Sequence, residues 1–349
     1  MTDTAATDTT ATGTTATDTA ATDTTATGTT AQPQRTAAES AARVRGPRVL
    51  LRRPSARTVQ LVCLAALIVN TGIVVTGGAV RLTNSGLGCP TWPECTAGSL
   101  VPVPSLGYHG VIEFSNRLLT YVVTAAAGLA LVATARQRPR RPVLVRYSWA
   151  LVLGVFAQAV IGGISVRTQL APGWVAFHFA FSMGMIAIAW LLWVRSREGD
   201  GPARPLLRRE LIWLARTLVT AAGAVVVVGT LVTGAGPHAG ALDAARRLPL
   251  KPVEITQAHA DLVFIVVGLT VALWFALKAI DAPAASVRAT RDLFLVLVAQ
   301  GAIGYTQYFT ALPSWLVLLH MTGACLTWIA AWRVLTSMRV RPQAAPAAV

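Results

Sequence analysis

Eight long apolar runs restrict this chain to a membrane fold. They lie at about 59–79, 111–135, 143–163, 174–195, 211–234, 255–280, 292–311 and 314–337. Each approaches the roughly 20 residues that a helix needs to cross the hydrocarbon core, and a backbone in lipid must satisfy its own hydrogen bonds. The run at 292–311 is the weakest, because Gln300, Thr306 and Gln307 dilute it. The sequence therefore predicts an all-α polytopic membrane protein with eight transmembrane helices.

The basic charge of the chain follows this topology. Lys and Arg number 30 against 15 Asp and Glu, which gives a net charge of +15. If the N-terminus is cytoplasmic, the basic residues on the outer side are only Arg81, Arg117, Arg167, Arg246, Arg247 and Lys251. Cytoplasmic segments of membrane proteins carry the excess of Lys and Arg. We therefore predict a multi-pass protein of the cell membrane with both termini in the cytoplasm, and no nucleic-acid partner.

A low-complexity tract begins the chain. Residues 2–16 are repeated without change at 17–31, and the tract has no apolar core of a signal peptide. Its composition cannot build a packed core, so we expect it to be disordered. We assign 1–57 to a cytoplasmic low-complexity and basic tail and 338–349 to a second cytoplasmic tail.

The membrane part contains an internal repeat. The segment PGWVAFH at 172–178 matches PSWLVLLH at 313–320, and IEFSNRLL at 112–119 aligns with ITQAHADL at 255–262. The two halves have the same orientation, so the repeat is parallel. Bundles of four helices hold cofactors between facing helices. The sequence predicts two repeated four-helix bundles.

The repeat sets the domain boundaries. We place an N-terminal four-helix bundle at 58–200 and a C-terminal four-helix bundle at 201–337. His178 in the first bundle and His320 in the second are 142 residues apart.

Histidines mark the outer ends of four predicted helices. The chain has five histidines: His109, His178, His238, His259 and His320. His259 and His320 occupy corresponding levels of one bundle, and two neutral imidazoles suit the two axial positions of a heme iron. Zinc would require a third or fourth ligand nearby. The alternative for any one histidine is a hydrogen-bonded polar group in the bundle interior. His238 is interpreted as a loop residue.

The N-terminal bundle differs at the corresponding site. Asn116 stands 143 residues before His259 and takes its place. His109, Glu113 and Asn116 have the spacing i, i+4 and i+7, which places them on one face of a helix. Glu113 either forms an ion pair with Arg117 at i+4 or is a carboxylate that takes or relays a proton.

Two cysteines, Cys89 and Cys95, lie in the outer loop segment GCPTWPEC. A close pair on the oxidising side is commonly a structural disulfide, but a reactive pair that passes electrons and a metal site are alternatives. Cys63 and Cys325 lie inside predicted helices, where we expect them to be packing residues.

Several segments resemble one known family. They are GGAVRLTNSGLGCPTWPEC, IEFSNRLLT, PGWVAFHF, QAHADL and LPSWLVLLHMTGA. In this order and spacing, over about residues 58–337, the chain resembles heme A synthase, an eight-helix membrane enzyme. The resemblance implies oxidation of a methyl group of heme O to the formyl group of heme A by successive hydroxylations.

The resemblance also implies roles for individual residues. His259 and His320 would be the axial ligands of a heme b cofactor that carries electrons. His178 would ligate the iron of the substrate heme, and Glu113 would be the essential carboxylate of catalysis.

One departure from the family affects the substrate site. The commonest family pattern is Glu-x-x-His-Arg, whereas this chain has Glu113, Asn116 and Arg117. His109 lies seven residues before Asn116, about 10 Å along a helix, which argues against a simple replacement. We expect His178 to hold the substrate iron alone.

The resemblance further implies a disulfide between Cys89 and Cys95. From their positive charge and their place on the outer side of the membrane alone, Arg81, Arg117 and Arg167 are candidates for pairing with the substrate propionates. We expect a heme O synthase and an electron-transfer protein as partners, the latter of a kind that the sequence does not specify.

Two other functions fit part of the pattern. A membrane b-type cytochrome in quinol-linked electron transfer would use His259 and His320 but leaves Glu113 unexplained. A transporter would use Glu113 as its proton site and leaves the histidine pair unexplained.

Overall fold

The structure, a computed structural model, describes residues 53–238, 240 and 247–342. The repeated tract at 2–31, Arg246 and the end of the C-terminal tail lie outside the described residues.

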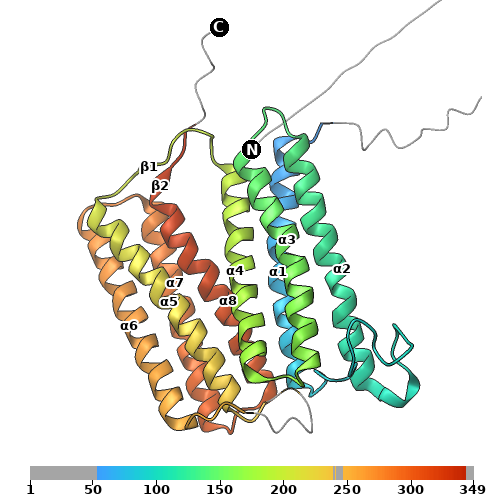
Figure 1. Cartoon of the computed structure of the whole chain (residues 1–349). Coiled ribbons are helices and arrows are strands. Elements are labelled where there is room, and N and C mark those ends of the chain that lie inside the picture. Colours follow the sequence, from blue (N-terminus) through green and yellow to red (C-terminus); the bar gives the residue numbers. More distant parts are fainter. Residues whose placement is uncertain (1–52, 239, 241–246, 343–349) are drawn as a thin grey trace, which may run out of the picture. The chain divides into compact units, whose positions relative to one another are not determined.

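Eight long helices make up most of the described chain (Figure 1). They are α1 (Ala56–Leu82), α2 (Gly107–Arg136), α3 (Pro142–Arg167), α4 (Pro172–Arg197), α5 (Arg209–Ala235), α6 (Pro252–Ala279), α7 (Ala284–Phe309) and α8 (Ser314–Ser337). A short 3-10 helix, Pro104–Leu106, precedes α2. The two-residue strands β1 (Arg204–Pro205) and β2 (Arg339–Val340) pair antiparallel. The prediction of an all-α fold with eight helices is confirmed.

Proline and serine explain several helix starts. Pro142, Pro172 and Pro252 are the first residues of α3, α4 and α6, a position where proline loses no helical hydrogen bond. Ser55 precedes α1, and its hydroxyl accepts a 3.1 Å hydrogen bond from the Thr58 N–H, which satisfies one of the free donors of the first turn.

Seven of the eight described helices are long and apolar enough to cross a membrane, and α7 is the one that falls short. This helix begins before the predicted run, and its first turns contain Arg288, Arg291 and Asp292. It nevertheless packs along both α6 and α8. The chain is therefore a multi-pass membrane protein, and its weakest predicted span is the helix with the most polar start.

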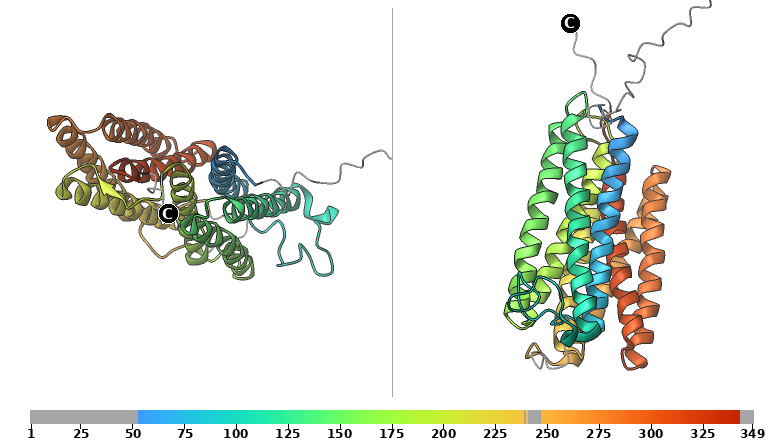
Figure 2. Two further views of the ribbon diagram at one scale, coloured as in Figure 1. Left: turned by 90° about the horizontal axis from the view of Figure 1, so that it is seen from above. Right: turned by 90° about the vertical axis from the view of Figure 1, so that its right-hand side faces the viewer.

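Contacts between the helices fall into two groups. In the first, α1 contacts α2 and α4, and α3 contacts α2 and α4; in the second, α5 contacts α6 and α8, and α7 contacts α6 and α8. Contacts of α8 with α1 and α4, and of α4 with α5, join the groups. Figure 2 shows the helices running side by side. We call α1–α4 the N-terminal half and α5–α8 the C-terminal half.

Each half has its own buried core. Cys63 of α1 and Cys325 of α8 are fully buried in the N-terminal core, so the prediction that they are packing residues is confirmed. The Trp328 indole donates a 2.8 Å hydrogen bond to the Met183 carbonyl, which ties α8 to α4.

The α1–α2, α3–α4, α5–α6 and α7–α8 connections lie at one end of the helices (Figure 1), and we call it the loop end.

Candidate functional site

Four histidines lie in helices near the loop end. His109 is the third residue of α2, His178 the seventh of α4, His259 the eighth of α6 and His320 the seventh of α8. The three latter rings therefore lie about two turns inside their helices, at similar depths, as the sequence predicts.

His259 and His320 face each other between α6 and α8. Their ring centroids are 6.5 Å apart, and the ring planes make an angle of 67°. A metal–imidazole bond is about 2.0 Å long, so two rings on opposite sides of one iron have centroids about 6 Å apart. The pair therefore fits the two axial positions of a single heme iron.

Each of the three deeper histidines packs against a glycine of the preceding helix. A Cβ added at Gly229 of α5 would lie 3.1 Å from His259 Cε1. At Gly304 of α7 it would lie 3.4 Å from His320 Cε1, and at Gly162 of α3 it would lie 3.2 Å from His178 Cε1. A Cβ would be tight at Gly229 and Gly162 and in ordinary contact at Gly304, so each glycine lets its imidazole lie directly against the neighbouring helix.

The Nδ1 atoms of these three rings are buried without a hydrogen-bond partner. The backbone of Val225 lies near the His259 ring. The two groups are not placed so that His259 Nδ1 forms a hydrogen bond. The edge of each ring that contains Nδ1 and Cε1 faces the glycine. Nε2 is then the nitrogen available to a metal.

Two glutamines repeat the same contact in both halves. Gln158 Nε2 donates to the His178 carbonyl at 3.2 Å, and Gln300 Nε2 donates to the His320 carbonyl at 2.9 Å. Gln158 also donates to Ser182 Oγ. Each glutamine therefore fixes the helix turn from which a candidate iron ligand projects.

Glu113 is buried, with 6% of its surface exposed. Its Oε1 forms an ion pair with Arg117 Nη2 at 2.6 Å, and its Oε2 accepts a 2.6 Å hydrogen bond from the Cys89 N–H. The i, i+4 ion pair considered from sequence is present. The carboxylate also fastens the α1–α2 loop to α2, a contact that the sequence did not predict.

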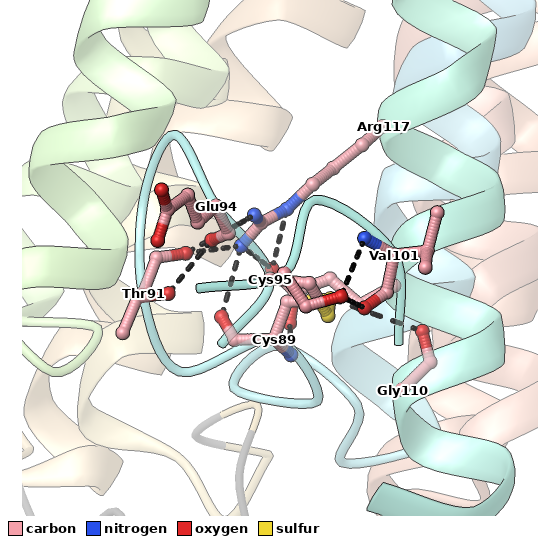
Figure 3. The surroundings of a disulfide bond; sticks show 9 residues. Cys89, Thr91, Glu94, Cys95, Val101, Gly110 and Arg117 are labelled. Atoms are coloured by element: carbon pink, nitrogen blue, oxygen red, sulfur yellow. Dashed lines mark hydrogen bonds and ion pairs between the residues drawn. A yellow bond between two sulfur atoms is a disulfide. The ribbon is translucent and has the colours of Figure 1, made fainter. Parts of the chain in front are cut away.

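Arg117 reaches into the same loop (Figure 3). Its guanidinium donates to the carbonyls of Cys89 at 2.9 Å, Thr91 at 3.1 Å and Glu94 at 3.2 Å. Together with Glu113, these acceptors engage Nε and both terminal nitrogens. Arg117 is therefore a loop anchor in this arrangement, with little donor capacity left for a propionate.

Cys89 and Cys95 form a disulfide with an S–S distance of 2.03 Å, so the disulfide is confirmed. Bonded sulfurs are not thiolate ligands, which removes the metal alternative in this state. Both cysteines are fully buried.

The connection between α1 and the 3-10 helix, residues 83–103, contains the disulfide, and we call it the disulfide loop. A Cβ at Gly163 would collide with the Trp92 ring, so Trp92 lies directly on α3. The neighbouring residue Gly162 contacts His178. The disulfide loop therefore packs on α3 at the residue next to the glycine that faces His178.

Asn116 and His109 have protein partners. Asn116 Oδ1 accepts a 2.8 Å hydrogen bond from Thr76 Oγ1 on α1. His109 Nδ1 lies 2.9 Å from Ser85 Oγ. The Ser85 contact holds His109 near the start of α2, consistent with the expectation that it does not replace a histidine at position 116.

Arg81 and His238 join the halves at the loop end. Arg81 donates to the His238 carbonyl at 2.8 Å and to the Thr233 carbonyl at 3.2 Å. His238 Nε2 lies 2.9 Å from the Leu312 carbonyl oxygen. His238 is thus a loop residue, as predicted, with a structural contact to the α7–α8 connection.

In the described residues, no group of three or more His, Cys, Asp or Glu side chains could hold a metal ion.

The fold and the histidine pair define a multi-pass membrane protein suited to binding heme. Residues 60–332 match the family model COX15-CtaA, described as cytochrome oxidase assembly protein. The chain belongs to this family, in which the matching curated relatives are named heme A synthase.

Two relatives cover most of the chain. A heme A synthase of Rhodopseudomonas palustris strain CGA009 is 31% identical over 76% of this chain and 84% of its own length. That of strain TIE-1 is 30% identical over 82% of this chain and 88% of its own length. The heme A synthase of Geobacillus thermodenitrificans is 34% identical over 38% of this chain, and the match spans 41% of that protein.

Sequence reasoning missed the partners of the histidines. These are the three glycines and the two glutamines. A signal was present for two of the pairs, because Gly162 and Gly304, and Gln158 and Gln300, have the same 142-residue offset as His178 and His320.

Proposed function

We propose that this chain is a heme A synthase, which oxidises the methyl group of heme O to the formyl group of heme A by successive hydroxylations. The observation that carries the proposal is the His259–His320 pair, with the spacing of two axial ligands, in a chain of this family. A heme b held by this pair supplies electron transfer when it is bound.

The substrate site belongs to the N-terminal half in this proposal. His178, Gly162 and Gln158 repeat the arrangement of His320, Gly304 and Gln300. This correspondence supports two repeated four-helix bundles, each with a heme site at the loop end. His178 is the ligand of the substrate iron, and apolar helix surfaces receive the farnesyl tail.

Glu113 is the proton-transfer group of the proposal. It is the buried carboxylate of the N-terminal half at the depth of the histidines. The Cys89 N–H and Arg117 fix both of its oxygens, and a fixed carboxylate can hold or move a proton at a defined place.

The membrane orientation follows from charge. Arginine is abundant at the end opposite the loop end, where α2, α4 and α8 finish. The positive-inside rule then places the termini in the cytoplasm and the loop end outside. Heme O would enter from the lipid, with a heme O synthase and an electron-transfer protein as partners.

One observation favours a second function. The oxygens of Glu113 are engaged in contacts that a purely structural residue would also make. A membrane b-type cytochrome would need the C-terminal histidine pair alone, with Glu113 serving only to anchor the disulfide loop.

Heme extraction distinguishes the two functions. The protein is purified after co-expression with a heme O synthase, and its hemes are separated by chromatography. Heme A together with heme b is expected from a heme A synthase. Heme b alone, with unconverted heme O in the membranes, would favour the cytochrome.

Loss of the disulfide should impair the substrate half alone. We expect the Cys89→Ser/Cys95→Ser variant to form much less heme A while it retains heme b. The cross-link closes a short ring, so its entropic contribution to stability is only about 2 kcal/mol. Its larger effect is on the Cys89 N–H that holds Glu113. The heme A to heme b ratio measures this, and an unchanged ratio would show that Arg117 and Trp92 suffice to hold the disulfide loop.

A further inference from the structure

Asn116 occupies the place in the N-terminal half that His259 takes in the C-terminal half. The segment IEFSNRLL at 112–119 aligns with ITQAHADL at 255–262, and this alignment pairs Asn116 with His259. Asn116 and His259 each stand 20 residues before the last residue of α2 and α6. Asparagine therefore replaces histidine at the same level of α2 and α6.

Thr76 of α1 is the hydrogen-bond partner of Asn116. The Asn116 Oδ1 accepts a 2.8 Å hydrogen bond from Thr76 Oγ1. The Ile73 carbonyl is a second acceptor for the same hydroxyl, at the longer distance of 3.2 Å.

This substitution changes what the site can bind. Axial ligands of heme iron are His, Cys, Met or Tyr, and the Asn116 carboxamide is none of these. Its Oδ1 is occupied by Thr76, whereas Nδ2 makes no hydrogen bond with any described residue. The pair therefore presents a fixed N–H donor where the C-terminal half presents an iron ligand.

We propose that Asn116, oriented by Thr76, donates a hydrogen bond to a small ligand, such as water or a diatomic molecule, bound to the substrate-heme iron on the side opposite His178. This inference rests on the proposed function, because it needs a heme in the N-terminal half. Hydrogen-bond donors in a distal pocket select ligand binding over simple electron transfer. Thr76 is the positioning residue and Asn116 the ligand-contacting residue.

Cyanide binding to the ferric protein tests the proposal. Cyanide accepts a hydrogen bond and binds only an iron with an open position, so a heme b between His259 and His320 does not compete. With both hemes loaded, Asn116→Leu should weaken cyanide binding about five- to tenfold, the value of one hydrogen bond. Thr76→Val should weaken it in the same direction by less. Thr71→Val is the matched control, because the Thr71 hydroxyl bonds the Leu67 carbonyl of its own helix.

A rebuilding experiment gives an independent readout. In Asn116→His, the histidine of the C-terminal half is copied, and we expect the second heme to become six-coordinate and low-spin and to lose cyanide binding. Heme b content reports folding in every variant.

The outcomes separate the two proposals. Heme A formation by the wild type, together with equal cyanide affinity in Asn116→Leu and the wild type, overturns the inference and leaves the proposed function intact. A low-spin second heme in the wild type also overturns it. If the wild type neither forms heme A nor takes up heme O, the proposed function and the inference fall together.

Discussion

Replacing Glu113 with glutamine is expected to abolish heme A formation while heme b stays bound. Glutamine has nearly the same size, and its Oε1 can still accept the Cys89 N–H. It carries no charge and cannot take or relay a proton. General acid–base catalysis contributes about 10²- to 10⁴-fold, so conversion of heme O should fall below detection. Heme b should be unaffected, because His259 and His320 lie in the other half.

Glu94→Gln is the matched control for this change. Glu94 belongs to the same loop, is exposed, and accepts the Gly98 N–H at 2.9 Å. We expect this variant to form heme A. Extraction and chromatography of the hemes from both variants provide the measurement. Heme A in Glu113→Gln would leave Glu113 as an anchor of the disulfide loop and remove its proton-transfer role.

The helices of this protein could be predicted because lipid leaves the backbone few alternatives. Apolar runs of about 20 residues in a membrane protein become helices whatever their neighbours are. The first turns of α7 contain charged residues and do not follow the apolar pattern. The predicted run at 292–311 therefore missed the start of this helix at Ala284.

The histidine pair could also be predicted, because a repeat placed both residues at one level. The glycine partners could not be recognised singly, since glycine is common in membrane helices. Among the described glycines, Gly162, Gly229 and Gly304 are the ones whose added Cβ would meet an imidazole ring. That property depends on helix rotation, which the sequence alone does not determine.

The contacts of Arg117 show a second limit. Its positive charge and its place on the outer side of the membrane suggested a propionate partner. An irregular loop, however, has backbone carbonyls that are not bonded within a helix or sheet and therefore need other hydrogen-bond donors. The carbonyls of Cys89, Thr91 and Glu94 take up the guanidinium. No spacing in the sequence indicates which carbonyls of an irregular loop turn inward.

Replacing His320 with alanine is expected to remove the low-spin heme b spectrum and most of the bound heme b. In the proposed site this change would remove one of two iron ligands and leave His259 as the other. The Gln300 contact is to the His320 backbone, so the helix turn should stay in place and leave an imidazole-sized gap. Added imidazole should therefore restore a six-coordinate spectrum in His320→Ala, which loss of folding would not allow.

His238→Gln is the control for a change of histidine at the loop end, because glutamine can still donate to the Leu312 carbonyl. We expect this variant to keep heme b, whereas His259→Ala/His320→Ala should bind none. A ligand that binds only the folded protein raises its stability, so the double variant should also have a lower Tm than the heme-loaded wild type. Absorption spectra and heme content of the purified variants decide the matter. Retention of low-spin heme b by the double variant would refute the assignment of this pair.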